Sequence, residues 1–466
     1  MTMKKIAIIY GSAEGIQKRA LEQLVETVLD CTGEYPVCLP AESYAGEDYR
    51  CIYIGTKQNN AFLGTLPGEP LTEAESYRLS VTEDAAYIEG FDDGGVLYGC
   101  ADFYCKYLIP HEPLDSSGNH FDNVLKMEKM PAFELVSAPA IRHRGLWTWG
   151  HVIYDYKGYL DNMAKLKMNE VIIWNDFAPV NGAEVVAYAH ERNIKVIWGY
   201  SWFWDTNCAE IDVKGALENA ASVLAQYERE YRHLGGDGIY FQSFTELSVD
   251  NIGGICIAEA VTDLVNKAAA MFFEKYPDLE LQFGLHAESV REKLSFIAKT
   301  DPRVRIVWEN CGAFPFAYLP HQTENFDDTC DFVREICHLR GEGERFGAVT
   351  KGMVNLDWTA FEHPKGPYCI GIGSKSWHHD RTERKRRVWR YIQAYSMVHA
   401  DYARRMVKVM AEETGGDTHI TALVEDGMFE RQIMFPAALY AEILWDPGDS
   451  QKLLSETALR NYVEFA

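Results

Sequence analysis

Short apolar runs and longer amphipathic stretches alternate along the chain from residue 141 onward. Runs such as NEVIIWND at 169–176 are rich in β-branched and aromatic residues, which is typical of buried strands. The stretches between them carry apolar positions every three to four residues, as helices packed on one face do. The predicted strands cover 142–150, 169–176, 194–204, 237–246, 279–288, 303–312, 346–358 and 418–426. Such a succession of strand–helix units predicts a (β/α)8 TIM barrel.

A smaller α/β domain is predicted before the barrel. Its expected elements are strands at 5–10 and 49–55, a helix at 17–29, a hairpin at 77–81 and 86–90, and a helix at 94–108. Pro110, Pro113 and a Ser-Ser-Gly cluster then mark a connecting segment. We therefore divide the chain into a small α/β domain at 1–125 and a catalytic (β/α)8 barrel with C-terminal helices at 126–466.

The chain carries 69 acidic and 45 basic residues, which gives a formal net charge of −24. Such a surface repels nucleic-acid phosphates and anionic lipid headgroups, so we expect neither a nucleic-acid nor a membrane partner. The apolar run near the start closes on Gly11 and reads as a strand rather than a signal peptide. The 11 cysteines show no paired metal-ligand spacing, which favours reduced thiols in a cytoplasmic protein. We expect no metal and no cofactor, and the sequence leaves association into a homo-oligomer open.

The ends of the predicted barrel strands place aromatic and acidic residues on one face. TIM barrels keep their chemistry at the carboxyl ends of the strands. The candidates there are Trp149, Trp174, Asp176, Trp202, Thr245, Glu246, His286, Glu309, Asp357 and Trp358. Indole rings stack on the C–H faces of pyranoses, while carboxylates and histidines hydrogen-bond the hydroxyls, so this set predicts a carbohydrate site. The alternative for any one tryptophan is that it fills the barrel interior.

Glu246 is the predicted general acid. It ends the strand DGIYFQSFTE, where Phe241 and Phe244 would desolvate its carboxyl group and favour the protonated form that an acid needs. Glycosidic cleavage also requires a second carboxylate. Glu309 is the first choice because its strand lies two strands away around the ring. The residues that compete with it are Glu288, Asp176 and Asp357.

Three segments resemble the β-hexosaminidase family of glycoside hydrolases. The peptide HRGL at 143–146 looks like that family's strand-one arginine motif, and the stretch at 160–176 is similar to its helix-one and strand-two signature. The segment at 87–103 looks like the end of the α/β domain that precedes these barrels. The resemblance covers much of 75–250 loosely, and it implies an exo-acting hydrolase in which Arg144 holds sugar hydroxyls.

The fourth predicted strand departs from this family. Hexosaminidases end it with an Asp-Glu pair whose Asp orients the substrate acetamido group, whereas this chain has Thr245-Glu246. A hydroxyl-Glu ending is closer to the related α-glucuronidases, which implies an inverting reaction with Glu309 as base. The sequence thus predicts an exo-acting, hexosaminidase-like glycoside hydrolase. The alternatives are an α-glucuronidase-like inverting hydrolase and a barrel that binds carbohydrate without cleaving it.

Overall fold

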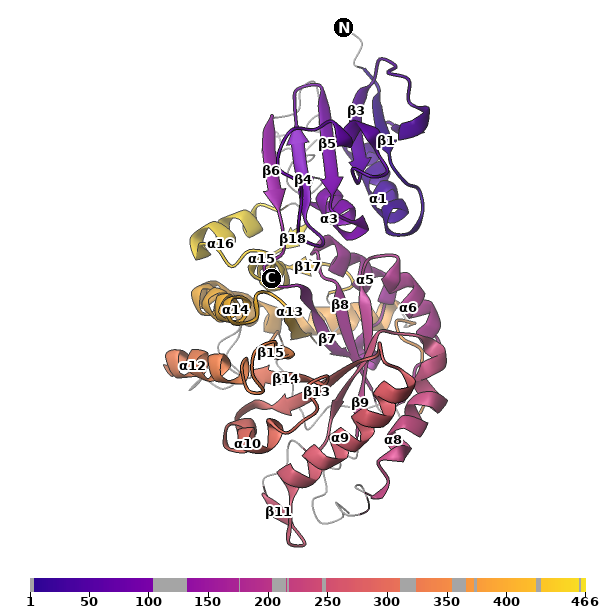
Figure 1. Ribbon diagram of the computed structural model, residues 1–466. Helices are drawn as coiled ribbons and strands as arrows, with labels where there is room; N and C mark the ends of the chain where they lie inside the picture. Colours follow the sequence, from indigo (N-terminus) through magenta and orange to yellow (C-terminus); the bar gives the residue numbers. More distant parts are fainter. Residues whose placement is uncertain are drawn as a thin grey trace.

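A computed structural model describes most of the chain. The described residues are 4–103, 132–175, 177–202, 215, 218–244, 249–310, 324–353, 366–372, 375–424, 429–460 and 462–466. They form a small sheet domain that sits on one side of a larger barrel surrounded by helices (Figure 1).

The amino-terminal domain is a mixed six-stranded sheet. Its strands run in the spatial order β2 (Val37–Pro40), β1 (Ile6–Tyr10), β3 (Arg50–Gly55), β5 (Ala85–Gly90), β4 (Tyr77–Val81) and β6 (Phe133–Ser137). Alternate residues such as Ile8, Ile52 and Ile88 face α1 (Gly15–Thr32) and α3 (Asp93–Phe103) in one apolar core. The strands connected through helices pair in parallel, whereas β4 pairs antiparallel with both of its neighbours.

Strand β6 lies beyond residue 125, where the sequence predicted the domain boundary. It pairs with β4, with Leu135 opposite Leu79, and so completes the first sheet. The amino-terminal domain therefore extends at least to Ser137. The hydrophobic pattern missed this strand because the apolar side chain of Val136 stands at an exposed position and interrupts the alternation of FELVS.

The second domain is a closed barrel of parallel strands. Its strands are, in spatial order, β7 (His143–Trp149), β8 (Glu170–Trp174), β9 (Lys195–Ser201), β10 (Gly238–Gln242), β13 (Glu280–His286), β14 (Arg305–Asn310), β15 (Phe346–Met353) and β16 (His419–Val424). Strand β16 pairs back onto β7 and closes the ring. The predicted fold, a (β/α)8 TIM barrel preceded by a small α/β domain, is confirmed.

Helices cover the outside of the barrel (Figure 1). They include α5 (Tyr156–Lys165), α6 (Gly182–His190), α8 (Ala221–Gln226), α9 (Ile257–Lys275), α10 (Leu294–Ile297), α12 (Phe326–Ile336), α13 (Lys375–Val398), α14 (Ala400–Thr414), α15 (Phe435–Trp445) and α16 (Ser450–Ala458). Helix α5 begins where Asp155 accepts hydrogen bonds from the backbone N–H groups of Lys157 (3.1 Å) and Gly158 (3.2 Å). Within the described ranges, no helix combines the length and the apolar content that crossing a bilayer requires.

Alternate residues of each barrel strand face either the interior or the helices. In β7, Trp147 and Trp149 belong to the interior core, whereas Leu146 packs with the helices. In β9, Ile197 faces the interior, whereas Trp198 and Tyr200 face the helices. The position of a residue within its strand therefore decides whether it can reach a site inside the barrel.

A buried ion pair joins the two domains. Arg144 of β7 contacts Glu75 of the first domain at 2.6 Å between Nη2 and Oε2. Its other nitrogens donate to the backbone carbonyls of Lys167 (3.0 Å) and Ile141 (2.7 Å). Because Arg144 is 1% exposed, this network replaces all the water that its guanidinium would otherwise bind.

Trp445, the last residue of α15, packs in the core of the first domain. Its ring centroid lies 5.8 Å from those of Tyr77 and Tyr98. The guanidinium of Arg144 lies 5.0 Å from the indole ring, which is within the range of a cation–π contact. A residue from the end of the barrel domain is thus part of the packing of the first domain.

Candidate active site

Aromatic residues line the carboxyl half of the barrel interior. Trp147 and Trp149 of β7 meet edge to face with their centroids 4.7 Å apart, and Trp147 stacks on Trp174 of β8 at 5.9 Å. Tyr240 of β10 lies edge-on to Trp147 at 6.0 Å and to Trp174 at 6.1 Å. All four side chains are buried. These offset and edge-to-face contacts are the favourable geometries for aromatic pairs, and they hold the rings in fixed positions.

Glu309 of β14 lies beside this aromatic group. Its Oε1 accepts hydrogen bonds from the hydroxyl of Tyr240, at 2.6 Å, and from the side-chain amide of Gln242. Glu309 is 2% exposed, and a buried carboxylate requires such donors to replace its hydration. It lies two residues after Val307, an interior residue of the same strand, so the carboxylate is held inside the barrel near the carboxyl ends of the strands.

His286 ends β13 next to Glu309. The two residues are register partners in adjacent parallel strands, so both side chains point to the same face of the sheet. The partly buried His286 also lines a small cavity of about 70 Å³ together with Ser243 and Phe244. Of the residues predicted from the sequence, His286 and Glu309 are therefore brought together.

Phe244 has a left-handed backbone conformation with φ of 54°. This conformation costs a residue with a side chain about 1–2 kcal/mol, and the buried ring of Phe244 helps to hold it. The strained residue directly precedes Thr245 and Glu246 in the chain. Backbone strain of this kind is concentrated at functional sites.

Five predicted site residues lie outside the described part of the chain: Asp176, Thr245, Glu246, Asp357 and Trp358. The side chain of Glu288, a competitor for the role of second carboxylate, is likewise outside it. Asp176 lies two residues after the end of β8, and Thr245 and Glu246 lie three and four residues after the end of β10. The pairing of Glu246 with Glu309 therefore stays a prediction.

Trp202 does not face the barrel interior, contrary to its predicted role in stacking on a sugar. Its ring stacks on Phe241 of β10 at 3.6 Å and on Phe272 of α9 at 5.6 Å. The side chain is 1% exposed. Trp202 thus packs the helices against the barrel, whereas Trp149 and Trp174 face the interior as their predicted site requires.

Arg144 also lies away from the predicted sugar site. It is the second residue of β7 and therefore lies at the amino end of the barrel. It faces away from the interior, toward Glu75 and Asn169, and the Arg144 backbone N–H donates to Asn169 at 2.8 Å. Its charge serves the contact between the domains, and it does not reach the carboxyl face where a sugar was expected.

The amino half of the interior is polar. Glu170, Gln282, Arg305 and His419 are all at most 5% exposed, and they occupy this end of their strands. A cavity of about 950 Å³ opens here and is lined in part by Glu170, Arg305 and His419. Tyr240 and Gln242 in the other half were also missed, although each alternates with an apolar neighbour in GIYFQ. The polar group at the amino end could have been predicted from the polar residues that stand at the start of otherwise apolar strands.

No protein-family model matches the chain, and no curated protein matches it in sequence. Its structure is similar to that of a GH138 enzyme targeting pectin rhamnogalacturonan II, with a TM-score of 0.55 and 12% identity over 96% of this chain and 64% of that chain. It is also similar to CpGH84B, with a TM-score of 0.54 and 11% identity over 97% of this chain and 70% of that chain. The chain thus spans less than two thirds of the GH138 enzyme. Both neighbours are glycoside hydrolases, and at these identities the likeness shows a shared fold.

Proposed function

We propose that the chain is a glycoside hydrolase that removes a terminal sugar, with Glu246 as general acid and Glu309 as second carboxylate. The observation that carries this proposal is the position of Glu309 inside the barrel, near the carboxyl ends of the strands. In TIM-barrel enzymes this end of the barrel carries the catalytic groups. In the sequence, Glu246 follows the strand whose residues Tyr240 and Gln242 donate hydrogen bonds to Glu309, which supports the proposed pairing.

In the proposed reaction, Glu246 gives its proton to the glycosidic oxygen while the bond from that oxygen to the anomeric carbon breaks. Water adds to the anomeric carbon, and Glu309 takes the proton from this water if the two carboxylates lie about 6.5–9.5 Å apart. At about 5–5.5 Å, Glu309 would itself attack the anomeric carbon, and water would release the sugar in a second step. The hydrogen bonds from Tyr240 and Gln242 orient Glu309 for either course.

Two neighbouring features support a site at this end of the barrel. The left-handed backbone of Phe244 immediately precedes the predicted acid, and strain is typical of segments that position reacting groups. His286 lies beside Glu309 in register, and its ring nitrogens can hydrogen-bond sugar hydroxyls.

The structural neighbours support the reaction class. Both are glycoside hydrolases built on this kind of fold, although a shared fold alone does not determine function. We propose that this chain also acts on a carbohydrate and hydrolyses its glycosidic bond. Because Thr245 stands where hexosaminidases have Asp, the residue that would orient a substrate acetamido group is replaced. We therefore favour a sugar that does not assist its own cleavage.

Turnover of a panel of aryl glycosides by the wild type and by Glu246→Gln tests this function. Loss of the proton donor is expected to lower kcat/KM by about 10²–10⁴-fold. The loss should be largest for poor leaving groups, because good leaving groups depart without protonation. Asp417→Asn is a matched control, since it removes one exposed carboxylate at the amino end and should leave turnover unchanged.

Two outcomes would contradict the proposal in different ways. Binding of a sugar by the wild type, with no turnover of any glycoside in the panel, would favour a barrel that binds carbohydrate without cleaving it. Full activity of Glu246→Gln on substrates with poor leaving groups would show that another residue is the acid.

A further inference from the structure

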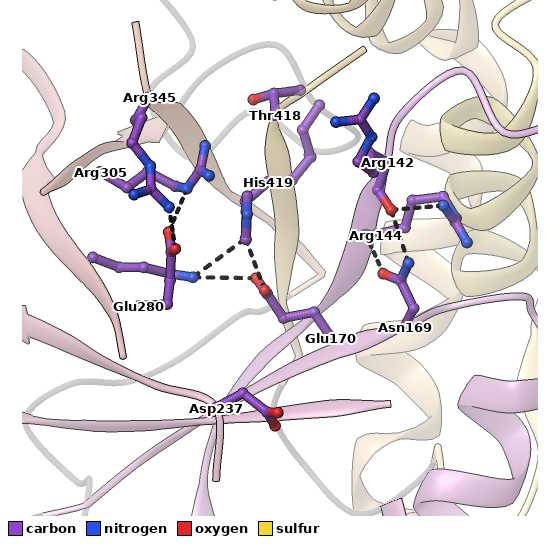
Figure 2. Close-up of polar contacts among 12 residues, drawn as sticks. Arg142, Arg144, Asn169, Glu170, Asp237, Glu280, Arg305, Arg345, Thr418 and His419 are labelled. Carbon is purple, nitrogen blue, oxygen red and sulfur yellow. Dashed lines mark hydrogen bonds and ion pairs between the residues drawn. The ribbon is translucent and has the colours of Figure 1, made fainter. Parts of the chain in front are cut away.

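Three side chains that commonly bind metals meet at the amino end of the barrel. His143 of β7, Glu170 of β8 and His419 of β16 come from three adjacent strands. Their ligand atoms all lie within 4.8 Å of one another. The rings of His143 and His419 are stacked with their centroids 3.9 Å apart, and His419 and Glu170 point toward each other (Figure 2). The group lies at the opposite end of the barrel interior from Glu309.

With Gln282 in its present orientation, the contacts of His419 are not all satisfied while Glu170 is ionised. Its Nδ1 lies 2.7 Å from Oε2 of Glu170 and 3.3 Å from Nε2 of Gln282. If Nδ1 carries a proton, its N–H group faces an N–H group of the Gln282 amide, and neither can accept a hydrogen bond. If Nδ1 carries no proton, its lone pair faces an oxygen of the ionised Glu170 carboxylate, and neither can donate. Neither form of His419 satisfies both neighbours while Glu170 is ionised.

Two shielded polar atoms at this cluster have no hydrogen-bond partner within the described part of the chain. They are Oε1 of Gln282, whose side chain is 0% exposed, and Nδ1 of His143. The two ends of an amide are nearly equal in shape, so Gln282 can turn by 180° in place. It then directs Oε1, in place of its N–H groups, toward Glu170 and His419. A lone pair of Gln282 would then lie beside those of Glu170 and His419.

We propose that His143, Glu170 and His419 bind a divalent cation of the zinc type, with the amide oxygen of Gln282 completing the set. Two imidazoles and one carboxylate are a donor set that zinc uses in proteins. Calcium and magnesium prefer ligands that are all oxygen. The cavity of about 950 Å³ is lined by His143, Glu170 and His419, and it gives the ion a route from solvent.

The positive groups around this cavity do not exclude a cation. Arg305 and Arg345 both contact Glu280 (Figure 2), with 2.7 Å between Nε of Arg305 and Oε1 of Glu280. The exposed side chain of Lys195 is screened by solvent. The carboxylate of Glu170 thus supplies the negative charge at the site.

A cation in this position would join the first and last strands of the barrel. Strands β7 and β16 close the ring, and His143 and His419 are register partners across that closure. An ion bound to the folded chain alone stabilises it by mass action. The site is independent of the proposed hydrolysis, and it would act on the stability of the barrel.

Zinc titration of the chelator-treated full chain by calorimetry tests the site. The wild type should bind one equivalent, and zinc should raise the midpoint of its thermal unfolding. His419→Gln and Glu170→Gln should each weaken zinc affinity by at least about 10-fold. Should either fail to fold, His143→Gln provides the measurement, because Nδ1 of His143 has no hydrogen bond to lose among the described residues. Cobalt(II) in place of zinc should give the visible absorption of a four-coordinate ion.

His338→Gln is the matched control. His338 contacts Glu413 at 2.9 Å and lines the same cavity, but its side chain is 47% exposed. Its replacement should leave the zinc affinity and the thermal shift unchanged. The proposal is overturned if the wild type binds no stoichiometric zinc. It is also overturned if His338→Gln removes zinc as effectively as His419→Gln, since that would indicate adventitious binding to surface histidines.

Discussion

The two halves of the barrel interior use their charged groups differently. In the amino half, charged groups contact one another, as Arg305 and Glu280 do at 2.7 Å. In the carboxyl half, the carboxylate of Glu309 receives hydrogen bonds from two neutral donors, Tyr240 and Gln242, beside a group of aromatic rings. TIM-barrel interiors are usually filled by bulky branched residues. The amino half departs from that packing by its paired charges, and the carboxyl half departs from it by its aromatic rings.

This difference suggests that the amino half contributes mainly to stability and that the carboxyl half carries the proposed chemistry. Charged groups that pair within the protein, as Arg305 and Glu280 do, hold the fold in one arrangement. A carboxylate held by neutral donors keeps its charge for the positive centre that develops during glycosidic cleavage. On this comparison, substitutions in the amino half should change stability, and substitutions beside Glu309 should change turnover.

Glu309→Gln should have the largest effect. We expect kcat to fall by about 10²–10⁴-fold, because an amide neither accepts a proton from water nor forms a glycosyl ester. Steady-state kinetics on the aryl glycosides measures this effect. Glu280→Gln is its counterpart in the amino half, and it should lower the free energy of unfolding while kcat stays near the wild-type value. Equal losses of kcat in the two variants would remove the distinction between the halves.

Arg144→Met should have the next largest effect, on stability alone. Removing one partner of a buried pair costs about 3–5 kcal/mol of unfolding free energy when the other charge is left without compensation. Here Glu75, which lies 2.6 Å from Arg144, keeps hydrogen bonds from the side-chain amides of Asn169 and Asn193, so we expect a loss at the lower end of this range. Urea unfolding measures the change, and kcat should be unaffected if Arg144 does not hold the sugar.

Arg142→Met is the control for this prediction. Arg142 and its partner Asp417 are 54% and 58% exposed, so the loss should be at most about 1 kcal/mol. A drop in kcat/KM for Arg144→Met, with stability unchanged, would restore the substrate role that the sequence suggested.

His190→Gln should have the smallest effect, and one that depends on pH. The hydrogen bond to Asp237 raises the pKa of His190 above 6.5 in the folded protein. Its contribution to stability is therefore complete below about pH 6.5 and is lost as the pH rises through the folded-state pKa. Since the pair is exposed, a few tenths of a kcal/mol are expected. Unfolding at pH 5.5 and at pH 8.5 should differ less in the variant than in the wild type, and an equal difference would contradict the assignment.

The strands of the barrel could be predicted because their apolar runs are continuous. The predicted segments 303–312 and 418–426 contain β14 and β16 in full. It was harder to predict which of their residues face the barrel interior and which face the helices, because strands buried on both faces do not alternate between apolar and polar positions. Trp202 shows the consequence, since β9, the strand directly before it, has large apolar residues on both faces.

For Arg144 the signal was present within its own strand. Trp147 and Trp149 face the interior, so Arg144, at an even position, faces the other way. Its place near the start of β7 also puts it at the amino end. Glu309, in contrast, has the same facing as Val307, so once the barrel is closed its place in the interior follows from the sequence.

The indole of Trp445 couples the stability of the two domains. It is 3% exposed, although the helix that carries it belongs to the barrel and the residues around it belong mainly to the first sheet. Separating the two domains between Ser137 and β7 would expose this apolar ring to water and take Glu75 away from Arg144. The sheet and the barrel are therefore expected to melt in a single cooperative transition, and neither fragment to persist alone.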